Sequence, residues 1–246
     1  MKAFIFAAGL GKRLQPLTNN KPKALVEVQG KTLLEHAINK LRSGGFQDII
    51  INIHYLGEQI VEFIHTHSFD DVTITISDES DLLLDTGGAL KNAAWFFDQN
   101  EPFIIYNVDV ISDINLNNML EFHQATKAMA TLAVRTRESS RYLLFDNNYI
   151  LKGWENTKSG ERISLTGSGG ETNRQAFSGI HIVDPTLFNY FPSKKIFPVT
   201  ELYLSLMKNK TIKGFNHDHT FWFDVGTPKK LKKAQNYLNN TGNILY

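Results

Sequence analysis

Residues 2–18 read KAFIFAAGLGKRLQPLT, and this stretch decides the fold. Its first part, residues 2–7, is almost continuously apolar, which is typical of a central parallel strand covered by helices on both faces. Glycines follow at positions 9 and 11, and Lys12 and Arg13 come directly after them. In an open α/β sheet, ligands bind at the carboxyl ends of the strands, where glycines let backbone N–H groups approach phosphate oxygens. The stretch therefore predicts a buried first strand that leads into a phosphate-binding turn.

The alternation of strand and helix continues through the first 110 residues. The expected strands are 48–54, 72–77 and 103–106, and the expected helices are 33–41, 59–65 and 87–97. The helical segments carry apolar residues three or four positions apart, whereas the strands are short and either apolar throughout or alternating. This order predicts an α/β protein with a Rossmann-like sheet, mixed but mainly parallel and flanked by helices.

The second half of the chain has a different pattern of expected strands and turns. Shorter strands joined by polar turns are expected at 132–136, 142–145, 149–154, 177–183 and 221–225, with helices at 198–208 and 228–238. We interpret these strands as antiparallel additions to the sheet. No internal repeat and no long linker separates the halves, so we predict a single domain over 1–246, made of a half at 1–110 and a half at 111–246.

Composition excludes several classes of protein. The 246 residues carry 26 Lys and Arg against 25 Asp and Glu, a net charge of +1, and no long run of like charge predicts a nucleic-acid partner. There is no cysteine, which excludes disulfides and thiolate metal sites. The apolar start is too short and too glycine-broken for a signal peptide, and no other run has the length of a membrane span. We expect a soluble, cytoplasmic protein without a membrane partner; whether it forms a homo-oligomer is left open.

The turn after the first strand does not fit the two best-known phosphate motifs. The dinucleotide fingerprint requires a third glycine where Leu14 stands, and the P-loop requires a different spacing that ends in Gly-Lys-Ser/Thr. Instead, four cations fall within twelve residues of the chain: Lys12, Arg13, Lys21 and Lys23. This density of positive charge favours a phosphate site over an ordinary solvated turn.

The longer pattern resembles a known family. AAGLGKRLQPLT at 7–18, followed by KPKALVEV at 21–28, is similar to the signature of the nucleotidyltransferases that make sugar nucleotides. Further motifs follow in family order: TGGAL at 86–90, NVD at 107–109, FSGI at 177–180 and WFDVGTP at 222–228. The resemblance spans essentially the whole chain. It implies the nucleotide-diphospho-sugar transferase fold and a magnesium-dependent enzyme that joins a nucleoside triphosphate to a sugar 1-phosphate and releases pyrophosphate, with the nucleotide bound by 1–110 and the sugar phosphate by 111–246.

Several subfamilies and one other class compete for the exact function. The short length, Asp85-Thr86-Gly87-Gly88 and the closing FDVGTP look most like the N-acetylmuramate 1-phosphate uridylyltransferases of peptidoglycan recycling. Mannose- or heptose-1-phosphate guanylyltransferases and phosphocholine cytidylyltransferases are the alternatives within the fold. A non-catalytic nucleotide-binding regulatory subunit is the alternative outside it, and a mere binder would not need the full set of charged motif residues.

Chemistry and resemblance together assign a role to each motif. Both substrates are anions, so the site must neutralise their repulsion and align them. An aspartate at a strand exit suits Mg²⁺, which takes one or two carboxylates plus phosphate oxygens. The resemblance implies that the triphosphate is bound by Gly9, Gly11, Lys12 and Arg13, and the base by Ala8, Gly87 and Gly88. It implies that Lys23 lies beside the α-phosphate and that Lys23 and Arg13 are the catalytic residues. It also implies that the sugar is bound by Asn107, Glu155 and Gly179, and magnesium by Asp109 and Asp224.

The chain departs from the family pattern at two places. Val108 stands where many members have glycine before the metal aspartate, and Trp154-Glu155-Asn156 stands where many have Glu-Lys-Pro, whose lysine binds the sugar phosphate. The second departure leaves the identity of the sugar open. His217 and His219 are interpreted as surface residues, and the lysines within 229–233 as a solvated helix face.

Overall fold

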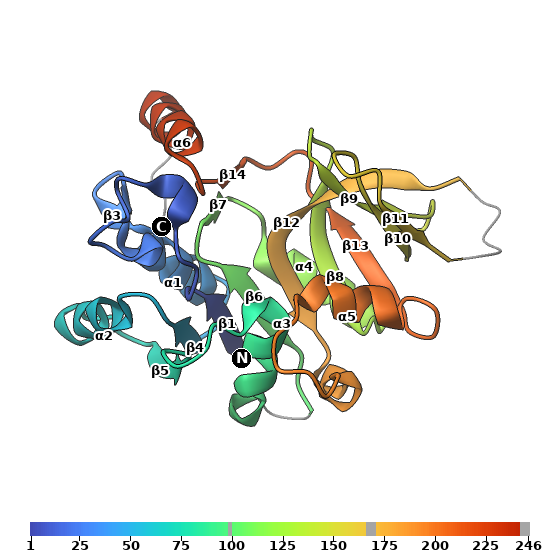
Figure 1. The fold of residues 1–246 in the computed structure, drawn as a ribbon, viewed down its shortest axis with the longest axis horizontal. Helices are drawn as coiled ribbons and strands as arrows, with labels where there is room; N and C mark the ends of the chain where they lie inside the picture. Colours follow the sequence, from blue (N-terminus) through green and yellow to red (C-terminus); the bar gives the residue numbers. More distant parts are fainter. Residues whose placement is uncertain (98–99, 166–170, 242–246) are drawn as a thin grey trace.

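The first half of the chain folds as four parallel strands joined by helices (Figure 1). The computed structural model describes residues 1–97, 100–165 and 171–241. The strands are β1 (Lys2–Phe6), β4 (Asp48–Ile53), β5 (Thr73–Asp78) and β6 (Phe103–Asn107), and the helices are α1 (Leu33–Ser43), α2 (Gly57–Thr66) and α3 (Asp85–Asn92). The predicted alternation is confirmed. The helix expected over 87–97 begins earlier and gives way to a 3₁₀ helix, η3 (Ala94–Phe96).

The second half adds mostly antiparallel strands. They are β8 (Ala130–Arg135), β9 (Arg141–Phe145), β10 (Leu151–Asn156), β11 (Arg162–Ser164) and β12 (Asn173–Val183), with helices α4 (Leu116–Thr126) and α5 (Val199–Leu206) and the 3₁₀ helix η4 (Pro185–Tyr190). Strand β12 is long enough to pair antiparallel with β6, β8 and β9. The sequence did not predict β13 (Ile212–Asn216), which pairs in parallel with β8.

Within the described residues, these strands form a ten-stranded sheet in the order β11-β10-β9-β12-β6-β1-β4-β5, in which β8 also pairs with β12, and β13 pairs with β8. Successive residues of each central strand enter opposite faces: Ala3 and Ile5 join the core under α1, α2 and α4, whereas Phe4 joins the core under α3 and α5. Figure 1 shows α3 and α5 in front of the sheet and α4 behind it. Burial on both faces explains why the central strands are apolar throughout.

Two small elements bring the end of the chain to the first strand. Strand β14 (Trp222–Asp224) pairs antiparallel with β7 (Val110–Ser112), directly after β6. The last helix, α6 (Pro228–Thr241), then packs beside the hairpin of β2 (Glu27–Val28) and β3 (Lys31–Thr32), as Figure 1 shows. The carboxyl ends of β1 and β6 and the segment after β14 therefore meet. No helix in the described ranges is both long enough and apolar enough to cross a membrane.

Candidate active site

The glycine turn after β1 is held in place by buried polar contacts. Asn52, at the carboxyl half of β4, accepts hydrogen bonds from the amides of Ala7 and Ala8 through Oδ1, at 2.7 and 3.4 Å. Gly11 has a φ of +64°, and a Cβ there would lie 3.0 Å from Thr18, whose hydroxyl donates to the Gly11 carbonyl at 2.9 Å. Glycine is therefore required at this position for both conformation and space.

The cations of the turn lie on two short 3₁₀ helices. Lys12 and Arg13 are exposed on η1 (Lys12–Leu14), and Lys23 begins η2 (Lys23–Leu25). The Lys23 ammonium forms an ion pair with Asp109, which follows β6, and both side chains are largely buried, at 15% and 13% exposed. The structure thus brings together two candidate site residues that are 86 positions apart in the sequence.

Asp224 is held by different partners at the end of β14. Its Oδ2 accepts from Lys230 at 2.6 Å, and its Oδ1 accepts from the Gly226 amide at 2.9 Å. Burial acts to raise the pKa of Asp224, but the hydrogen bonds from Lys230 and Gly226 outweigh it and hold the pKa below its ordinary value. The lysines of α6 were predicted to be solvated; Lys230 is exposed, but it also forms this ion pair.

Gly226 marks the point where the charged groups converge. A Cβ placed on it would lie 2.8 Å from Asp224 Oδ1, 3.2 Å from Arg13 Nη2 and 3.3 Å from Asp109 Oδ2. A backbone hydrogen bond from the Val225 amide to the Asp109 carbonyl, at 2.9 Å, fixes this approach. Arg13, Lys23, Asp109 and Asp224 therefore lie close together, and their roles stay predictions.

A cleft of about 440 Å³ opens beside these charges. Ala8, Gly9, Lys23, Asn107 and Asp109 are among the residues that line it. The backbone of Gly179 approaches Asn107 closely: its φ is +77°, and a Cβ there would lie 2.7 Å from Asn107 Nδ2. The glycine turn and the amide side chain of Asn107 thus both line the cleft.

Two further residues of the cleft were missed by the sequence analysis. Asn52 and Glu79 both line it, and Asn52 Nδ2 donates to Glu79 Oε1 at 2.8 Å. Burial raises the pKa of Glu79, although the bond from Asn52 acts in the opposite direction. A polar residue within the apolar run of β4, and a carboxylate just after β5, were the signals that could have identified them.

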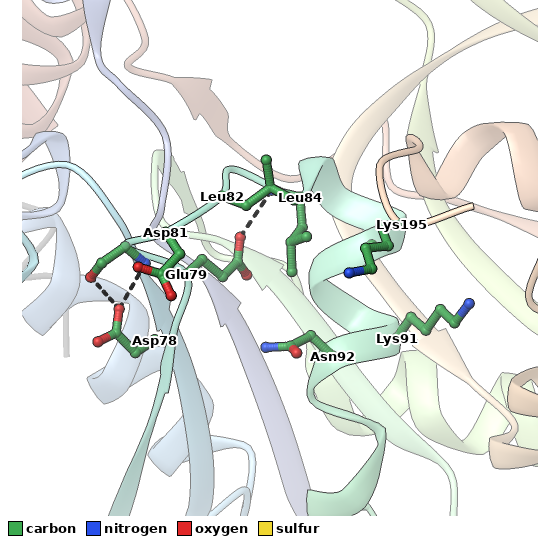
Figure 2. Close-up of a pocket in the computed structure, with 10 residues that line it drawn as sticks. Asp78, Glu79, Asp81, Leu82, Leu84, Lys91, Asn92 and Lys195 are labelled. Atoms are coloured by element: carbon green, nitrogen blue, oxygen red, sulfur yellow. Dashed lines mark hydrogen bonds between the residues drawn. The ribbon is translucent and has the colours of Figure 1, made fainter. Parts of the chain in front are cut away.

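Glu79 also borders a second pocket, of about 620 Å³ (Figure 2). Figure 2 shows Asp78 and Asp81 on one side of this pocket and Lys91 and Lys195 on the other. The two pockets therefore share Glu79 as a lining residue, and its Oε2 accepts from the Leu84 amide at 3.4 Å.

Gly87 and Gly88 are packed against a neighbouring loop. Both amides donate to the carbonyl of Phe197, at 2.8 and 3.2 Å. A Cβ on Gly87 would lie 2.4 Å from the Phe197 ring, and a Cβ on Gly88 would lie 2.1 Å from the Lys195 carbonyl oxygen. These contacts give both glycines a packing role that the sequence analysis had not considered. Their predicted contact with the base stays a prediction.

Gly88→Ala is expected to lower the free energy of unfolding by about 1–3 kcal/mol, because a methyl group would overlap backbone that cannot move aside cheaply. Alanine is favoured over glycine inside a helix by about 1 kcal/mol. A net loss of stability would therefore mean that the steric overlap costs more than this gain. Denaturant unfolding checks this result. Gly9→Ala, where a Cβ would meet nothing within 4 Å, is the matched control; equal stability of Gly88→Ala and wild type would contradict the packing role.

Glu155 and His217 lie in other surroundings. Glu155 forms an ion pair with Arg174, and the residues that line the described cleft do not include it. Its sugar contact stays a prediction. His217 was expected on the surface, which is wrong: it is 1% exposed, its Nε2 lies 2.8 Å from Ser178 Oγ, and burial lowers its pKa to about 4.

The fold is that of an α/β protein with a charged cleft beside the carboxyl ends of β1 and β6, and comparisons with known proteins identify its class. A family model described as Nucleotidyl transferase matches residues 2–148. The chain is 31% identical over 243 residues to N-acetylmuramate alpha-1-phosphate uridylyltransferase of Neisseria meningitidis, covering 96% of this chain and 97% of that one. It is also 31% identical over 251 residues to mannose-1-phosphate guanyltransferase of Saccharomyces cerevisiae, covering 98% of this chain but 65% of that protein.

A solved structure shares the fold. A putative glucose-1-phosphate thymidylyltransferase from Bacillus anthracis superposes with a TM-score of 0.81 at 21% identity, covering 96% of this chain and 94% of that one. The chain therefore belongs to the nucleotidyl transferase family. It is an enzyme of the sugar-1-phosphate nucleotidyltransferase class, with the nucleotide-diphospho-sugar transferase fold that the motifs predicted.

Proposed function

We propose that the enzyme transfers uridylate from UTP to N-acetylmuramate 1-phosphate and releases pyrophosphate. The observation that carries the proposal is the convergence of Arg13, Lys23, Asp109 and Asp224 around Gly226, beside a cleft that holds the glycine turn. The choice of substrates is supported by the Neisseria uridylyltransferase, which matches over 97% of its length. The yeast guanyltransferase matches over 65% of its length, so GTP with mannose 1-phosphate is the second candidate.

The residues of the site would act mainly by holding charge in place. The reaction is an in-line attack of a sugar-phosphate oxygen on the α-phosphorus of the triphosphate, so negative charge gathers where the two substrates meet. Lys23, in a largely buried position, would neutralise this charge, and burial strengthens its effect. Arg13 and Lys12 would hold the triphosphate with the amides of the glycine turn, since a planar guanidinium binds phosphate through two parallel hydrogen bonds.

Asp109 and Asp224 fit a magnesium ion by the chemistry of their atoms. Both present carboxylate oxygens to the space around Gly226, and such oxygens, together with phosphate, are the ligands that Mg²⁺ prefers. When bound, the ion would supply positive charge to the phosphate oxygens. In this structure the Lys23 ammonium is paired with the Asp109 carboxylate. When a substrate phosphate pairs with Lys23 instead, Asp109 needs another cation as its partner.

A pyrophosphate-release assay tests the proposed function. UTP, GTP, CTP and dTTP would each be combined with N-acetylmuramate 1-phosphate, mannose 1-phosphate, a heptose 1-phosphate and phosphocholine, in the presence of Mg²⁺. We expect UTP with N-acetylmuramate 1-phosphate to give the highest kcat/KM, by about tenfold or more over the other pairs. A higher value for GTP with mannose 1-phosphate would assign the guanylyl function instead. No release with any pair would support a nucleotide-binding subunit without catalysis.

A further inference from the structure

Strand β12 carries an irregular stretch where it pairs with β8. The register between the two strands shifts between Phe177 and His181, and Ser178 lies within this stretch. Bulges of this kind change the direction of the backbone and are common beside functional sites. Ser178 is fully buried, and the next residue, Gly179, has a φ of +77° and passes close to Asn107. Contacts that hold Ser178 in place therefore also hold the backbone beside Asn107, a residue of the cleft.

His217 holds Ser178 from the other side of β8, which pairs with both β12 and β13. It directly follows β13, and its backbone amide donates to the Val134 carbonyl of β8 at 3.1 Å. His217 is 1% exposed, and its Nε2 lies 2.8 Å from Ser178 Oγ. It is not among the residues that line the described cleft, so it can influence the site only through the residues that it holds.

The hydrogen bonds of the His217 ring give its two nitrogens different roles. The Thr220 hydroxyl donates its only proton to the His217 carbonyl at 3.0 Å, so its oxygen accepts from the Nδ1–H of the ring at 2.8 Å. Burial lowers the pKa of His217 to about 4, so the ring is neutral at neutral pH and Nε2 carries no proton. Nε2 therefore accepts a hydrogen bond from the Ser178 hydroxyl, and this bond fixes the Ser178 side chain.

The carbonyl of Ser178 anchors the strand that carries Asp224. It accepts from Trp222 Nε1 at 2.9 Å, and the guanidinium carbon of Arg137 lies 4.6 Å from the centre of the Trp222 ring. Trp222 begins β14 and Asp224 ends it. In the described part of the chain, β14 pairs with β7 alone, in a two-stranded sheet of three residue pairs. Because a sheet of this size is marginally stable by itself, the indole of Trp222 helps to set where Asp224 lies.

We propose that His217 is a positioning residue for Asp224. By fixing Ser178 it holds the indole of Trp222, and with it the short strand that brings Asp224 close to Asp109. The inference rests on the proposed function, in which Asp224 binds magnesium together with Asp109. Residues that orient metal ligands commonly change metal affinity or activity by about 10- to 100-fold when they are substituted.

Two substitutions of His217 separate the two hydrogen bonds of its ring. The amide of Asn reaches about as far as Nδ1, so His217→Asn keeps a partner for Thr220 and loses the bond to Ser178. The longer Gln reaches about as far as Nε2, so His217→Gln can still present an oxygen to Ser178. We expect His217→Asn to lower kcat and to raise the Mg²⁺ concentration for half-maximal pyrophosphate release, each by about tenfold, and His217→Gln to recover most of the loss. Ser178→Ala should match His217→Asn, and the double variant should lose no more than either, because both changes remove the same bond.

Exchange of the Trp222 indole proton with solvent gives a readout that does not depend on activity. The chain has three tryptophans, so the NMR spectrum of the labelled indoles is simple, and Trp222→Phe identifies the signal of Trp222. We expect this proton to exchange about tenfold faster in His217→Asn than in wild type, because its carbonyl partner is no longer fixed. Trp95, which is 68% exposed, is the internal reference.

His123→Gln is the matched control for the loss of a buried histidine. His123 is 3% exposed, and its Nδ1 lies 2.9 Å from the hydroxyl oxygen of Thr131. Its substitution should lower the free energy of unfolding without changing proton exchange at Trp222 or the Mg²⁺ dependence of activity.

Wild-type exchange and wild-type Mg²⁺ dependence in His217→Asn, or the same changes in His123→Gln, would overturn the proposal. Faster exchange at Trp222 with an unchanged Mg²⁺ dependence would also overturn it, because the indole would then not position Asp224. If His217→Asn does not fold, Ser178→Ala decides the question by the same two measurements. A wild-type enzyme that is inactive with every substrate pair would instead overturn the proposed function, while the exchange rates would still show whether His217 holds Trp222.

Discussion

Lys23→Ala is expected to lower kcat by about a hundred- to a thousandfold while the protein remains folded. The lysine ammonium is largely buried and paired with Asp109, so its charge is weakly screened by solvent. A water molecule in its place would not neutralise two phosphates that repel each other. The loss should appear in kcat more than in KM, because the interaction strengthens as charge develops during the reaction. Steady-state pyrophosphate release gives both constants.

Lys21→Ala is the matched control for Lys23→Ala. Lys21 belongs to the same Lys-Pro-Lys segment, is exposed, and lies 3.4 Å from Glu27 in a surface ion pair. Such surface ion pairs contribute about 0–1 kcal/mol to the free energy of unfolding, so activity and thermal stability should both stay near wild type. A Lys23→Ala enzyme with kcat within tenfold of wild type would remove Lys23 from the catalytic residues.

The sequence predicted the parts of the fold and the site that depend on local pattern. The apolar run of β1 and the glycine turn after it are fixed by neighbouring residues, and Asp109 follows β6 just as the turn follows β1. In a parallel sheet these strand ends meet at one edge, so the glycine turn and Asp109 were expected near each other, whereas the resemblance to the family placed Lys23 beside the phosphates. The family motif supplied the remaining step, because Asp224 reaches this edge only through the pairing of β14 with β7.

The parts that could not be predicted arise from packing between distant segments. Gly87 and Gly88 meet residues of the 195–197 loop, more than one hundred positions away. The burial of His217 depends on Ser178, which comes from the middle of β12. No local pattern carries this information. The contact between β10 and α5 was not predicted for the same reason, since these elements come together only in the folded chain.

Asp109→Ala combined with Asp224→Ala is expected to reduce pyrophosphate release to background, and chelation of Mg²⁺ should have the same effect on the wild-type enzyme. Both carboxylates face the space around Gly226, and the pKa of Asp224 lies below its ordinary value, so this group is ionised at neutral pH. Without these two groups the space around Gly226 has lost both of its carboxylates, the hard oxygen ligands that would hold Mg²⁺ there. Each single variant should lose about a hundredfold or more in kcat.

The two aspartates have different ion-pair partners, so the effect of each substitution on metal binding can be separated from its effect on stability. Asp109 neutralises Lys23, so Asp109→Ala leaves a largely buried ammonium without its partner and should also lower stability; Asp224 is paired with the exposed Lys230, so Asp224→Ala should cost little stability. Titration of each variant with Mg²⁺ in the activity assay reports metal binding independently of stability, with Asp113→Asn, an exposed carboxylate four positions after Asp109 in the sequence, as the control. A double variant that keeps wild-type activity, or a wild-type enzyme indifferent to chelation, would exclude these aspartates as the metal ligands.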